Sequence, residues 1–335
     1  MIPRSQSSPT RGYLVAFVGT AIWSTTAIFI GYLTTRFHMP PLVLAFWRDL
    51  IVAGTLFVVF ALVARPLLRL ERRDALFFVL YGFILAVFNA LWTASIGLNG
   101  AAVATVLVYS SPAFTALVGW RLWGERPDAL KVGAVALCMA GCALVSGAYE
   151  RAAWQVNPLG IVVGLAPGLA FAAYSLLGKA SSRRGVNPWT ATLYTFTFAA
   201  GFLLLAQRPA TLLWLSRPLA GGAGGWRDAL LGWGALVLLA AGPTIGGYGL
   251  YTVSLTMLPA ATANLIVTLE PAMTAILAFL LLGERLTGLQ LAGGLVILTG
   301  VVLLRVSERV SSATVVPPPP PQPRSLVDLD KKARL

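Results

Sequence analysis

Charged residues are scarce in this sequence, and their scarcity excludes most soluble folds. Only 11% of the 335 residues are charged, whereas 57% are hydrophobic. Soluble globular domains carry about 25% charged residues. The apolar residues also gather in long blocks instead of short amphipathic stretches. This composition predicts a membrane protein.

Cysteine and histidine are nearly absent, which excludes several kinds of site. Two cysteines and His38 are too few for a disulfide framework or a metal site. Cys138 and Cys142 lie four residues apart in one apolar block, where we expect small packing residues. The sequence also lacks a nucleotide-binding loop, a paired aspartate motif and an intramembrane histidine. We therefore expect no cofactor, no metal and no direct drive by ATP.

Ten apolar blocks have the length of transmembrane helices. Blocks near 20 residues match the roughly 30 Å hydrocarbon core of a bilayer. Spans of this kind are helical because lipid offers no partner for unpaired backbone groups. Short gaps leave little chain for a soluble domain. The blocks cover residues 13–35, 41–64, 75–97, 101–123, 129–149, 158–179, 188–206, 229–251, 260–282 and 287–306.

The net charge of +13 follows the topology of these blocks. If the N-terminus is cytoplasmic and the blocks alternate, 14 basic residues fall on the cytoplasmic side and 6 on the other. This count omits Arg48 and the four basic residues of the distal tail. By the positive-inside rule, both termini are cytoplasmic and the protein crosses the inner or plasma membrane repeatedly. The basic excess is then a topology signal, and we expect no nucleic-acid partner.

An internal repeat appears when the sequence is shifted by 159 residues. "AAVATVLVYSSPAFTALVGWRLWGER" (101–126) then aligns with "AATANLIVTLEPAMTAILAFLLLGER" (260–285), with 12 of 26 positions identical. Each repeat unit holds five predicted helices, and an odd number inverts the second unit in the membrane. Inverted repeats are typical of secondary transporters, whose substrate sites lie near the midplane.

The predicted fold is therefore an all-α integral membrane protein of ten transmembrane helices in two inverted five-helix repeats. The tail contains "VVPPPPPQPRS", which favours an extended, disordered segment. The predicted parts are a cytoplasmic N-terminus (1–11), the first repeat (12–149), an external linker (150–157), the second repeat (158–306) and a disordered proline-rich cytoplasmic tail (307–335).

The order of these features resembles the EamA-type branch of the drug/metabolite transporter superfamily. The resemblance covers about residues 12–306 and lies in the two five-helix units, in "AFWRDL" (45–50), and in a proline-containing helix that ends on Gly-Glu-Arg in each unit. It implies a ten-helix exporter or exchanger of small metabolites or drugs, without selecting a substrate. A glutamate before the ninth-helix proline also recurs in that family, here as Glu270.

Two prolines lie at the centres of predicted spans. Pro112 and Pro271 cannot donate to the carbonyls four residues earlier, those of Val108 and Val267. In hydrocarbon such carbonyls need a partner from protein, water or ligand. The prolines therefore mark either flexible points near a binding site or kinks that only shape packing.

Matched polar faces accompany the prolines, and Glu270 stands on one of them. A charged residue at mid-span costs about 2.5–3.5 kcal/mol on insertion scales. Glu270 is either protonated or ionised beside Arg48. It either serves transport, as a proton carrier or a cation contact, or is a structural residue that bridges two helices. Its counterpart in the first unit is Ser111. One face holds Ala263, Val267, Glu270 and Thr274, the other Ala104, Val108, Ser111 and Thr115; together they would form a cavity.

Further polar and aromatic residues are weaker candidates. Arg48 either binds a substrate carboxylate or phosphate, holds Glu270 ionised, extends outward to the membrane surface, or ties its helix to a neighbour's carbonyl. Its neighbour Asp49 need not pair with it, because adjacent helical residues point about 100° apart. Asn89 and Asn264 are either ligands or interhelical hydrogen-bonders. Trp23 and Trp92 could line the cavity for flat apolar substrates, and Tyr248 lies in the glycine-rich stretch 242–249.

The favoured function is a secondary transporter that exports small organic metabolites or drugs, amino-acid-like or aromatic solutes among them, by alternating access. Protons are a candidate coupling ion. A channel or a non-transporting scaffold is the alternative, and a membrane-embedded lipid enzyme is less favoured because no clustered catalytic set is present. Both units lie in one chain, so we expect no obligate protein partner.

Overall fold

The computed structural model describes residues 9–124, 129–150, 158–207, 211, 225–282 and 287–314. Across these residues the backbone forms helices joined by short turns, with no strand. Seven helical stretches are long and apolar enough to cross a membrane, and residues 129–145 and 288–303 form shorter apolar helices. The prediction of an all-α integral membrane protein is thereby confirmed.

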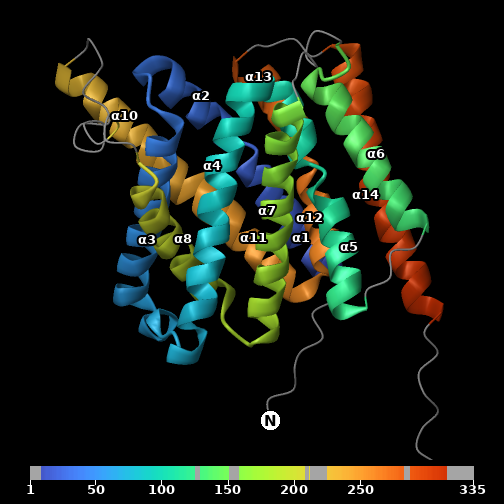
Figure 1. Ribbon diagram of the computed structural model, residues 1–335, viewed down its shortest axis with the longest axis horizontal. Coiled ribbons are helices and arrows are strands. Elements are labelled where there is room, and N and C mark those ends of the chain that lie inside the picture. Colours follow the sequence, from blue (N-terminus) through green and yellow to red (C-terminus); the bar gives the residue numbers. More distant parts are fainter. Residues whose placement is uncertain are drawn as a thin grey trace, which may run out of the picture.

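The helices run in the following order (Figure 1). The first half contains α1 (Pro9–Trp23), α2 (Thr26–Phe37), α3 (Pro41–Val63), the 3₁₀ turn η1 (Arg65–Leu68), α4 (Arg72–Val108), α5 (Ser111–Trp123) and α6 (Ala129–Ser146). The second half contains α7 (Pro158–Arg183), α8 (Pro188–Leu205), α10 (Gly225–Leu239), the π-helical turn η3 (Ala240–Thr244), α11 (Ile245–Met257), α12 (Ala260–Val267), α13 (Glu270–Leu282) and α14 (Gly288–Thr314).

The predicted first span, 13–35, is broken into α1 and α2. The Ser24 hydroxyl donates to the carbonyl of Ala21 at 2.7 Å, and the Thr25 hydroxyl donates to that of Ile22 at 2.8 Å. Such local bonds from side chain to backbone compete with the helical pattern. The break was not predicted, because two hydroxyls within an apolar block leave the block as a whole strongly apolar.

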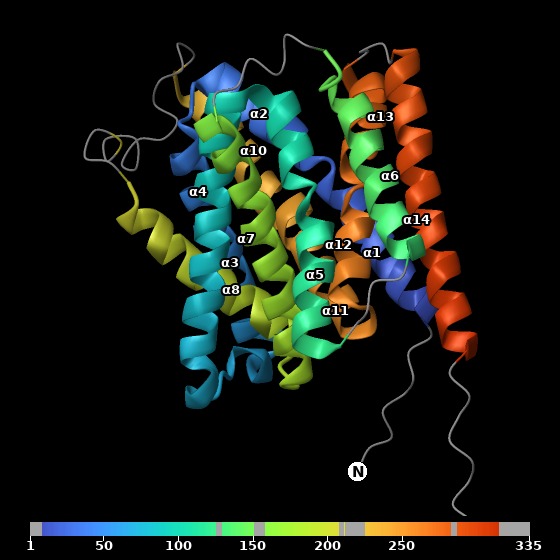
Figure 2. The same ribbon diagram turned by 45° about the vertical axis from the view of Figure 1, so that its right-hand side comes forward.

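The predicted spans 75–97 and 101–123 are divided elsewhere. Helix α4 continues to Val108, through the expected gap at 98–100, but its ribbon turns over at one end of the bundle, and its last part already runs back in the direction that α5 continues (Figures 1 and 2). The chain leaves the helix at Tyr109 and Ser110 instead. Pro112 then lies in the first turn of α5, where its missing N–H needs no partner.

The second repeat unit breaks at the matching place. Helix α12 ends at Val267 and α13 begins at Glu270, so that Pro271 lies in its first turn. The Thr268 hydroxyl donates to the carbonyl of Leu265 at 2.6 Å, much as that of Ser110 donates to Leu107 at 2.6 Å. Each predicted kinked span is thus interrupted, and the chain becomes helical again with a proline as the second residue of the new helix.

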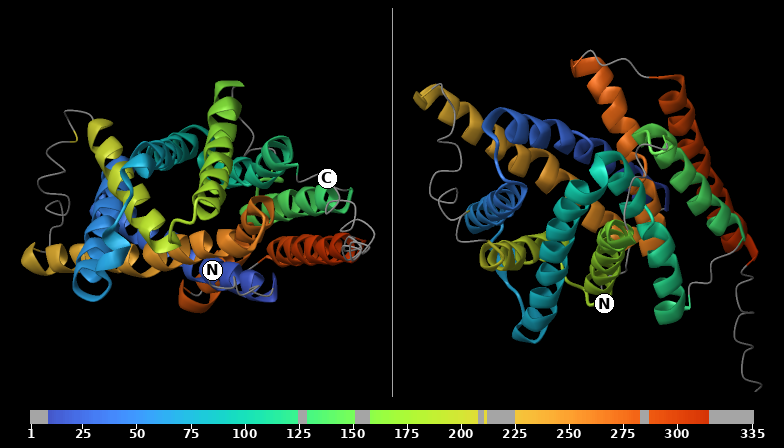
Figure 3. Two further views of the ribbon diagram at one scale, coloured as in Figure 1. Left: turned by 90° about the horizontal axis from the view of Figure 1, so that it is seen from below. Right: turned by 45° about the horizontal axis from the view of Figure 1, so that its top comes forward.

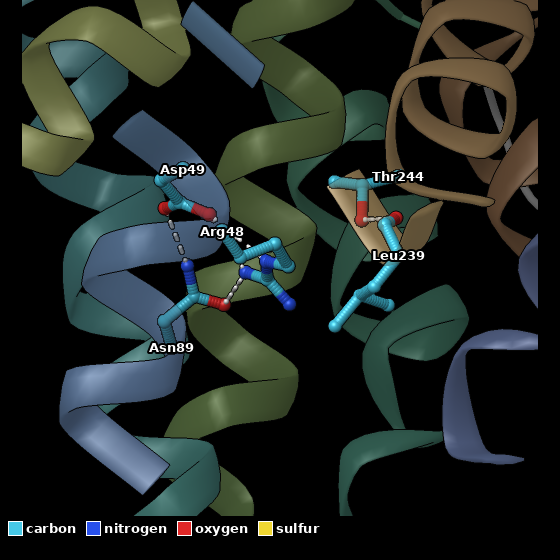
Figure 4. A network of polar contacts seen from close by, with 5 residues as sticks. All are labelled: Arg48, Asp49, Asn89, Leu239 and Thr244. Carbon is cyan, nitrogen blue, oxygen red and sulfur yellow. Dashed lines mark hydrogen bonds and ion pairs between the residues drawn. The ribbon is translucent and has the colours of Figure 1, made fainter. Parts of the chain in front are cut away.

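The predicted span 229–251 also contains an irregular turn. Pro243 cannot donate to the carbonyl of Leu239, four residues earlier. The backbone forms the π-helical turn η3 there, and the Thr244 hydroxyl donates to the Leu239 carbonyl at 2.8 Å (Figure 4). Single π-helical turns of this kind frequently occur at functional sites.

Helices α6 and α14 lie side by side at one edge of the bundle (Figure 3). A Cβ on Gly141 would lie 2.7 Å from the carbonyl oxygen of Gly293, and one on Gly300 would lie 2.7 Å from Cys138 Sγ. Only small residues permit so close an approach. Both cysteines are buried there and free, as expected for packing residues.

Helix α1 begins and α14 ends at the same end of the bundle (Figure 2). Helix α14 extends to Thr314, beyond the predicted end at 306 and into the segment expected to be disordered. The Gly-Glu-Arg triplet at 283–285, residues 151–157 and the tail from residue 315 lie outside the described residues.

Candidate functional site

The two helix breaks in the repeats lie against each other. The Tyr109 hydroxyl, from the turn between α4 and α5, donates to Oε2 of Glu270 at 2.9 Å. The Ser111 hydroxyl donates to Oδ1 of Asn264 on α12 at 2.9 Å. Each bond joins one residue of a predicted polar face, Glu270 or Ser111, to a residue of the other unit that lies outside the predicted faces.

Asn264 joins four helices through hydrogen bonds. Its Nδ2 atom donates to Thr115 Oγ1 of α5 at 2.8 Å and to Ser175 Oγ of α7 at 3.2 Å. The Ser175 hydroxyl in turn lies 2.6 Å from the hydroxyl of Tyr251 on α11. All four residues and Ser111 are buried. The face that carries Ser111 and Thr115 is therefore a closed interhelical contact and not an open cavity wall.

Arg48, Asp49 and Asn89 form a closed, buried polar triangle between α3 and α4 (Figure 4). Arg48 Nη2 lies 2.9 Å from Asp49 Oδ1, and Arg48 Nε donates to the same oxygen at 3.0 Å. Arg48 Nη2 also donates to Asn89 Oδ1, and Asn89 Nδ2 to Asp49 Oδ2, both at 3.1 Å. Only 7% of Arg48 is exposed, so it does not reach outward to the membrane surface.

This pairing corrects the sequence-based interpretation of Asp49. The angle between adjacent helical side chains applies at Cβ, but the arginine has a long stem and folds back onto its neighbour. A buried arginine without water needs a carboxylate, and Asp49 is within reach. Asn89 forms hydrogen bonds between α3 and α4, which is one of the two roles that the sequence left open for it.

Glu270 differs from Arg48 because it has no ionic partner in the part of the chain that the structure describes. Among the described residues it forms no ion pair with Arg48 or any other cation, and its side-chain hydrogen bond comes from Tyr109. Glu270 is partly exposed, whereas residues 262–269 before it are all buried. Tyr248 lies within electrostatic range of both Arg48 and Glu270. The site thus contains one neutralised arginine and one carboxyl group open to a proton or a cation.

Trp23 and Tyr248 pack inside an aromatic cluster. Their ring centroids are 4.1 Å apart, and Phe171 and Tyr251 each lie 6.0 Å from Trp23. A Cβ on Gly247 would lie 2.9 Å from the Cβ of Trp23, so glycine is needed for this approach. Trp92 is partly buried against the same core. In this conformation both tryptophans support the core.

An open cavity of about 800 Å³ lies at the surface of the bundle between α2, α10 and α13, and most of its lining residues are exposed. Its walls are apolar apart from Tyr32 and Thr274. The Thr274 hydroxyl donates to the carbonyl of Ser24, in the break between α1 and α2, at 3.0 Å. Thr274 lies four residues after Glu270, one turn along α13 on the same face. Of the residues singled out from the sequence, Thr274 lines this cavity.

Two residues of the site were missed by the sequence-based interpretation. Tyr109 precedes Ser111 by two positions, just as Thr268 precedes Glu270, and this offset alone could have drawn attention to it. Ser175 carries no such signal, because a lone serine within an apolar block is common in membrane helices.

Comparison with known proteins agrees with this architecture. The model of the EamA-like transporter family matches residues 10–147 and 158–306. The probable amino-acid metabolite efflux pump of Escherichia coli is 28% identical over 78% of this chain and 85% of its own length. The threonine/homoserine exporter RhtA of Salmonella typhimurium is 27% identical over 67% and 69% of the two chains.

Two further matches point the same way. An uncharacterized transporter of Synechocystis is 28% identical over 70% of this chain and 67% of its own. A solved structure titled "Crystal structure of protein" has a TM-score of 0.70 at 18% identity, over 90% of this chain and 98% of that one, which shows a shared fold.

These relatives are named as transporters or efflux pumps and not as enzymes. The family match covers nearly all of the described helices, and those helices are long and apolar enough to cross a bilayer. The protein is therefore a multi-pass membrane transporter, and the chain belongs to the EamA-like transporter family.

Proposed function

We propose that this transporter is a secondary carrier that exports small organic metabolites by alternating access. One observation carries the proposal: the two broken helices meet at the Tyr109–Glu270 hydrogen bond within the membrane span. Broken helices at the interface of two repeats are where secondary transporters bind their substrates. A carboxyl group at that place, with no ionic partner within the described ranges, is suited to bind a proton or a cation.

The proposed architecture is ten transmembrane helices in two inverted five-helix units, with both termini in the cytoplasm. Its support is the agreement between repeat and structure: a shift of 159 residues places the break at 109–110 on the break at 268–269. The ranges matched by the family model, 10–147 and 158–306, lie close to the two proposed units.

Glu270 is the proposed coupling residue, ahead of Arg48. The guanidinium of Arg48 is already neutralised by Asp49, so an anionic substrate would have to compete with a buried carboxylate. Figure 4 shows the guanidinium beside Asp49 and Asn89, with Leu239 and Thr244 across from it. Glu270 has no such competitor among the described residues.

Amino-acid-like solutes are the proposed substrate class. The support comes from the names of two relatives, a threonine/homoserine exporter and an amino-acid metabolite efflux pump. The apolar lining of the open cavity beside Thr274 supports solutes with an apolar or aromatic part.

Counterflow in reconstituted vesicles tests the proposal. Vesicles loaded with one unlabelled amino acid from a panel that includes threonine, homoserine and tryptophan receive the labelled compound outside. A carrier accumulates label transiently above equilibrium and saturates. A channel equilibrates without overshoot and a scaffold gives no flux, and either result across the panel would contradict the proposed carrier of amino-acid-like solutes.

A further inference from the structure

The Tyr109–Glu270 contact joins the break of one repeat unit to the break of the other. Tyr109 is 8% exposed and belongs to the two-residue turn between α4 and α5. Glu270 is the first residue of α13, directly after the turn at Thr268 and Leu269. Their hydrogen bond of 2.9 Å therefore connects the two places where the α-helical pattern is interrupted.

This contact has no twin in the pseudo-symmetric arrangement. The residues equivalent to Tyr109 and Glu270 are Thr268 and Ser111. The Thr268 hydroxyl donates to its own backbone at Leu265, and the Ser111 hydroxyl donates to Asn264. The two units thus share their backbone breaks but differ in the one polar contact that includes an ionisable group.

A phenol hydroxyl supports a carboxylate more strongly than a carboxylic acid. Hydrogen bonds to an ionised acceptor are roughly twice as strong as neutral ones. A donor to the charged form also favours that form over the protonated one. Uptake of a proton by Glu270 weakens the contact, while the Tyr109 hydroxyl keeps its own proton.

We propose that Tyr109 is a positioning residue whose hydroxyl holds the ionised Glu270 carboxylate at the junction of the two helix breaks and releases it when Glu270 is protonated. The inference rests on the proposed function of Glu270 in coupling. It adds a second residue to that function and makes the break between α4 and α5 respond to the charge of Glu270.

Few other titratable groups face Glu270. Cys142 of α6 and Tyr248 of α11 lie within electrostatic range of it. The part of α14 that packs on α13, up to Leu303, and the whole of α12 contain no titratable residue. Helix α1 meets α13 near Ser24, and its nearest titratable residue, Tyr13, is about 16 Å away along the helix. Tyr109 is the group of this set that forms a hydrogen bond with Glu270.

Infrared titration of the reconstituted protein tests the inference with the proton as the only ligand. The carboxylic acid band of Glu270 is identified by its loss in Glu270→Gln, and its amplitude is followed against pH. In Tyr109→Phe the midpoint is expected to rise by about 1–2 pH units, the equivalent of losing a hydrogen bond to a charged group. Tyr194→Phe is the matched control, because it removes a phenol that bonds to the Leu68 carbonyl instead.

A second variant changes Glu270 and leaves Tyr109 intact. Glu270→Asp withdraws the carboxyl group by one methylene from an intact Tyr109, so its midpoint is also expected to rise. Wild-type midpoints in both variants would overturn the inference. A Tyr109→Phe variant that transports threonine or tryptophan more slowly, but with the wild-type midpoint and pH profile, would also overturn it, because that result indicates a structural role.

The transport assay separates this inference from the proposed function. If Glu270→Gln transports with the wild-type pH profile, the coupling function of Glu270 fails and the inference fails with it. If Glu270→Gln loses the pH dependence while Tyr109→Phe keeps the wild-type midpoint, the coupling function stands and the inference alone fails.

Discussion

Two ionisable side chains within the spans of this transporter, Arg48 and Glu270, have opposite surroundings. The guanidinium of Arg48 is neutralised by Asp49 and braced by Asn89, whereas Glu270 has a phenol hydroxyl as its hydrogen-bond donor and no ionic partner among the described residues. The Arg48–Asp49–Asn89 triangle ties α3 to α4 and stabilises the charged form of Arg48. Glu270 can alter its charge with a single proton, and for this reason we place the coupling chemistry there.

Asp49→Asn is expected to destabilise the protein strongly. The substitution keeps the shape of the side chain but leaves Arg48 as a buried charge without compensation. Removing one partner of a buried ion pair costs about 3–5 kcal/mol, whereas replacing the pair by apolar residues is often neutral. Thermal unfolding in detergent should therefore show a large drop in unfolding temperature for Asp49→Asn. The double variant Arg48→Met, Asp49→Leu should show a much smaller drop. Equal stability of Asp49→Asn and wild type would contradict this account of the triangle.

Sequence reasoning located individual polar groups better than it located their partners. Glu270 and the two prolines stand out because charge and proline are rare in apolar spans. Their contacts depend on which helices meet, and Tyr109 is 161 positions from Glu270. The pairing of Asp49 with Arg48 was not predicted, because the angle between adjacent helical side chains does not describe how far a flexible arginine reaches.

At the scale of elements, the breaks in the helices are the features closest to the site. Helix α7 packs directly on the turn between α4 and α5: a Cβ on Gly168 would lie 2.8 Å from Ser110 Oγ and 3.1 Å from the carbonyl oxygen of Val108. The carbonyl that Pro112 leaves without an amide partner is therefore covered by the backbone of α7. Glycine at 168 allows the second unit to approach the break of the first.

Gly168→Ala is expected to disturb this contact. The added methyl group overpacks the turn, which costs about 1–3 kcal/mol and slows transport if the turn must move. Gly201→Ala in α8 is the control, because no atom lies within 4 Å of the place that its methyl group would occupy and alanine favours a helix. Thermal unfolding and counterflow of both variants check the prediction, and identical behaviour of the two would refute it.

The positions of most helices followed from the sequence, but several of their ends did not. Hydrophobic length locates α3, α6 and α8 within a few residues, because each is a simple apolar block. It cannot locate the break at Ser24 and Thr25 or the π-helical turn at Pro243, since both lie within continuous apolar sequence. It also placed a gap at 98–100, where α4 remains helical.

At the scale of the whole molecule, the two repeat units are joined at one end of the bundle by a polar contact. Arg184, after α7, donates to Asp74 of α4 at 3.0 Å and lies over the Phe77 ring at 4.3 Å from its centroid. Nearby, Lys179 donates to the carbonyls of Leu255 and Leu258 at 2.9 and 2.7 Å. Alternating access requires contacts of this kind to open during each cycle.

A covalent link across this contact is expected to stop transport. Cysteines at positions 74 and 184 can be joined by a short reducible bifunctional thiol reagent, and the native cysteines are buried. Counterflow should be lost on linking and recovered on reduction, while either single cysteine variant treated alike should retain its flux. Full flux with the link intact would show that this end of the bundle need not open.

The central claim is that the carboxyl group of Glu270, at the junction of the two broken helices, couples transport to protons. The most direct measurement is flux against pH in reconstituted vesicles, with wild type beside Glu270→Gln. The Gln variant keeps the size of the side chain and can still accept a hydrogen bond from Tyr109. It cannot take up or release a proton over the pH range of the flux measurement. We predict normal insertion, a flux reduced by about 10- to 100-fold, as for a lost interaction of about 1.5–3 kcal/mol, and no remaining pH dependence. A Gln variant that transports at the wild-type rate with the wild-type pH profile would contradict the account.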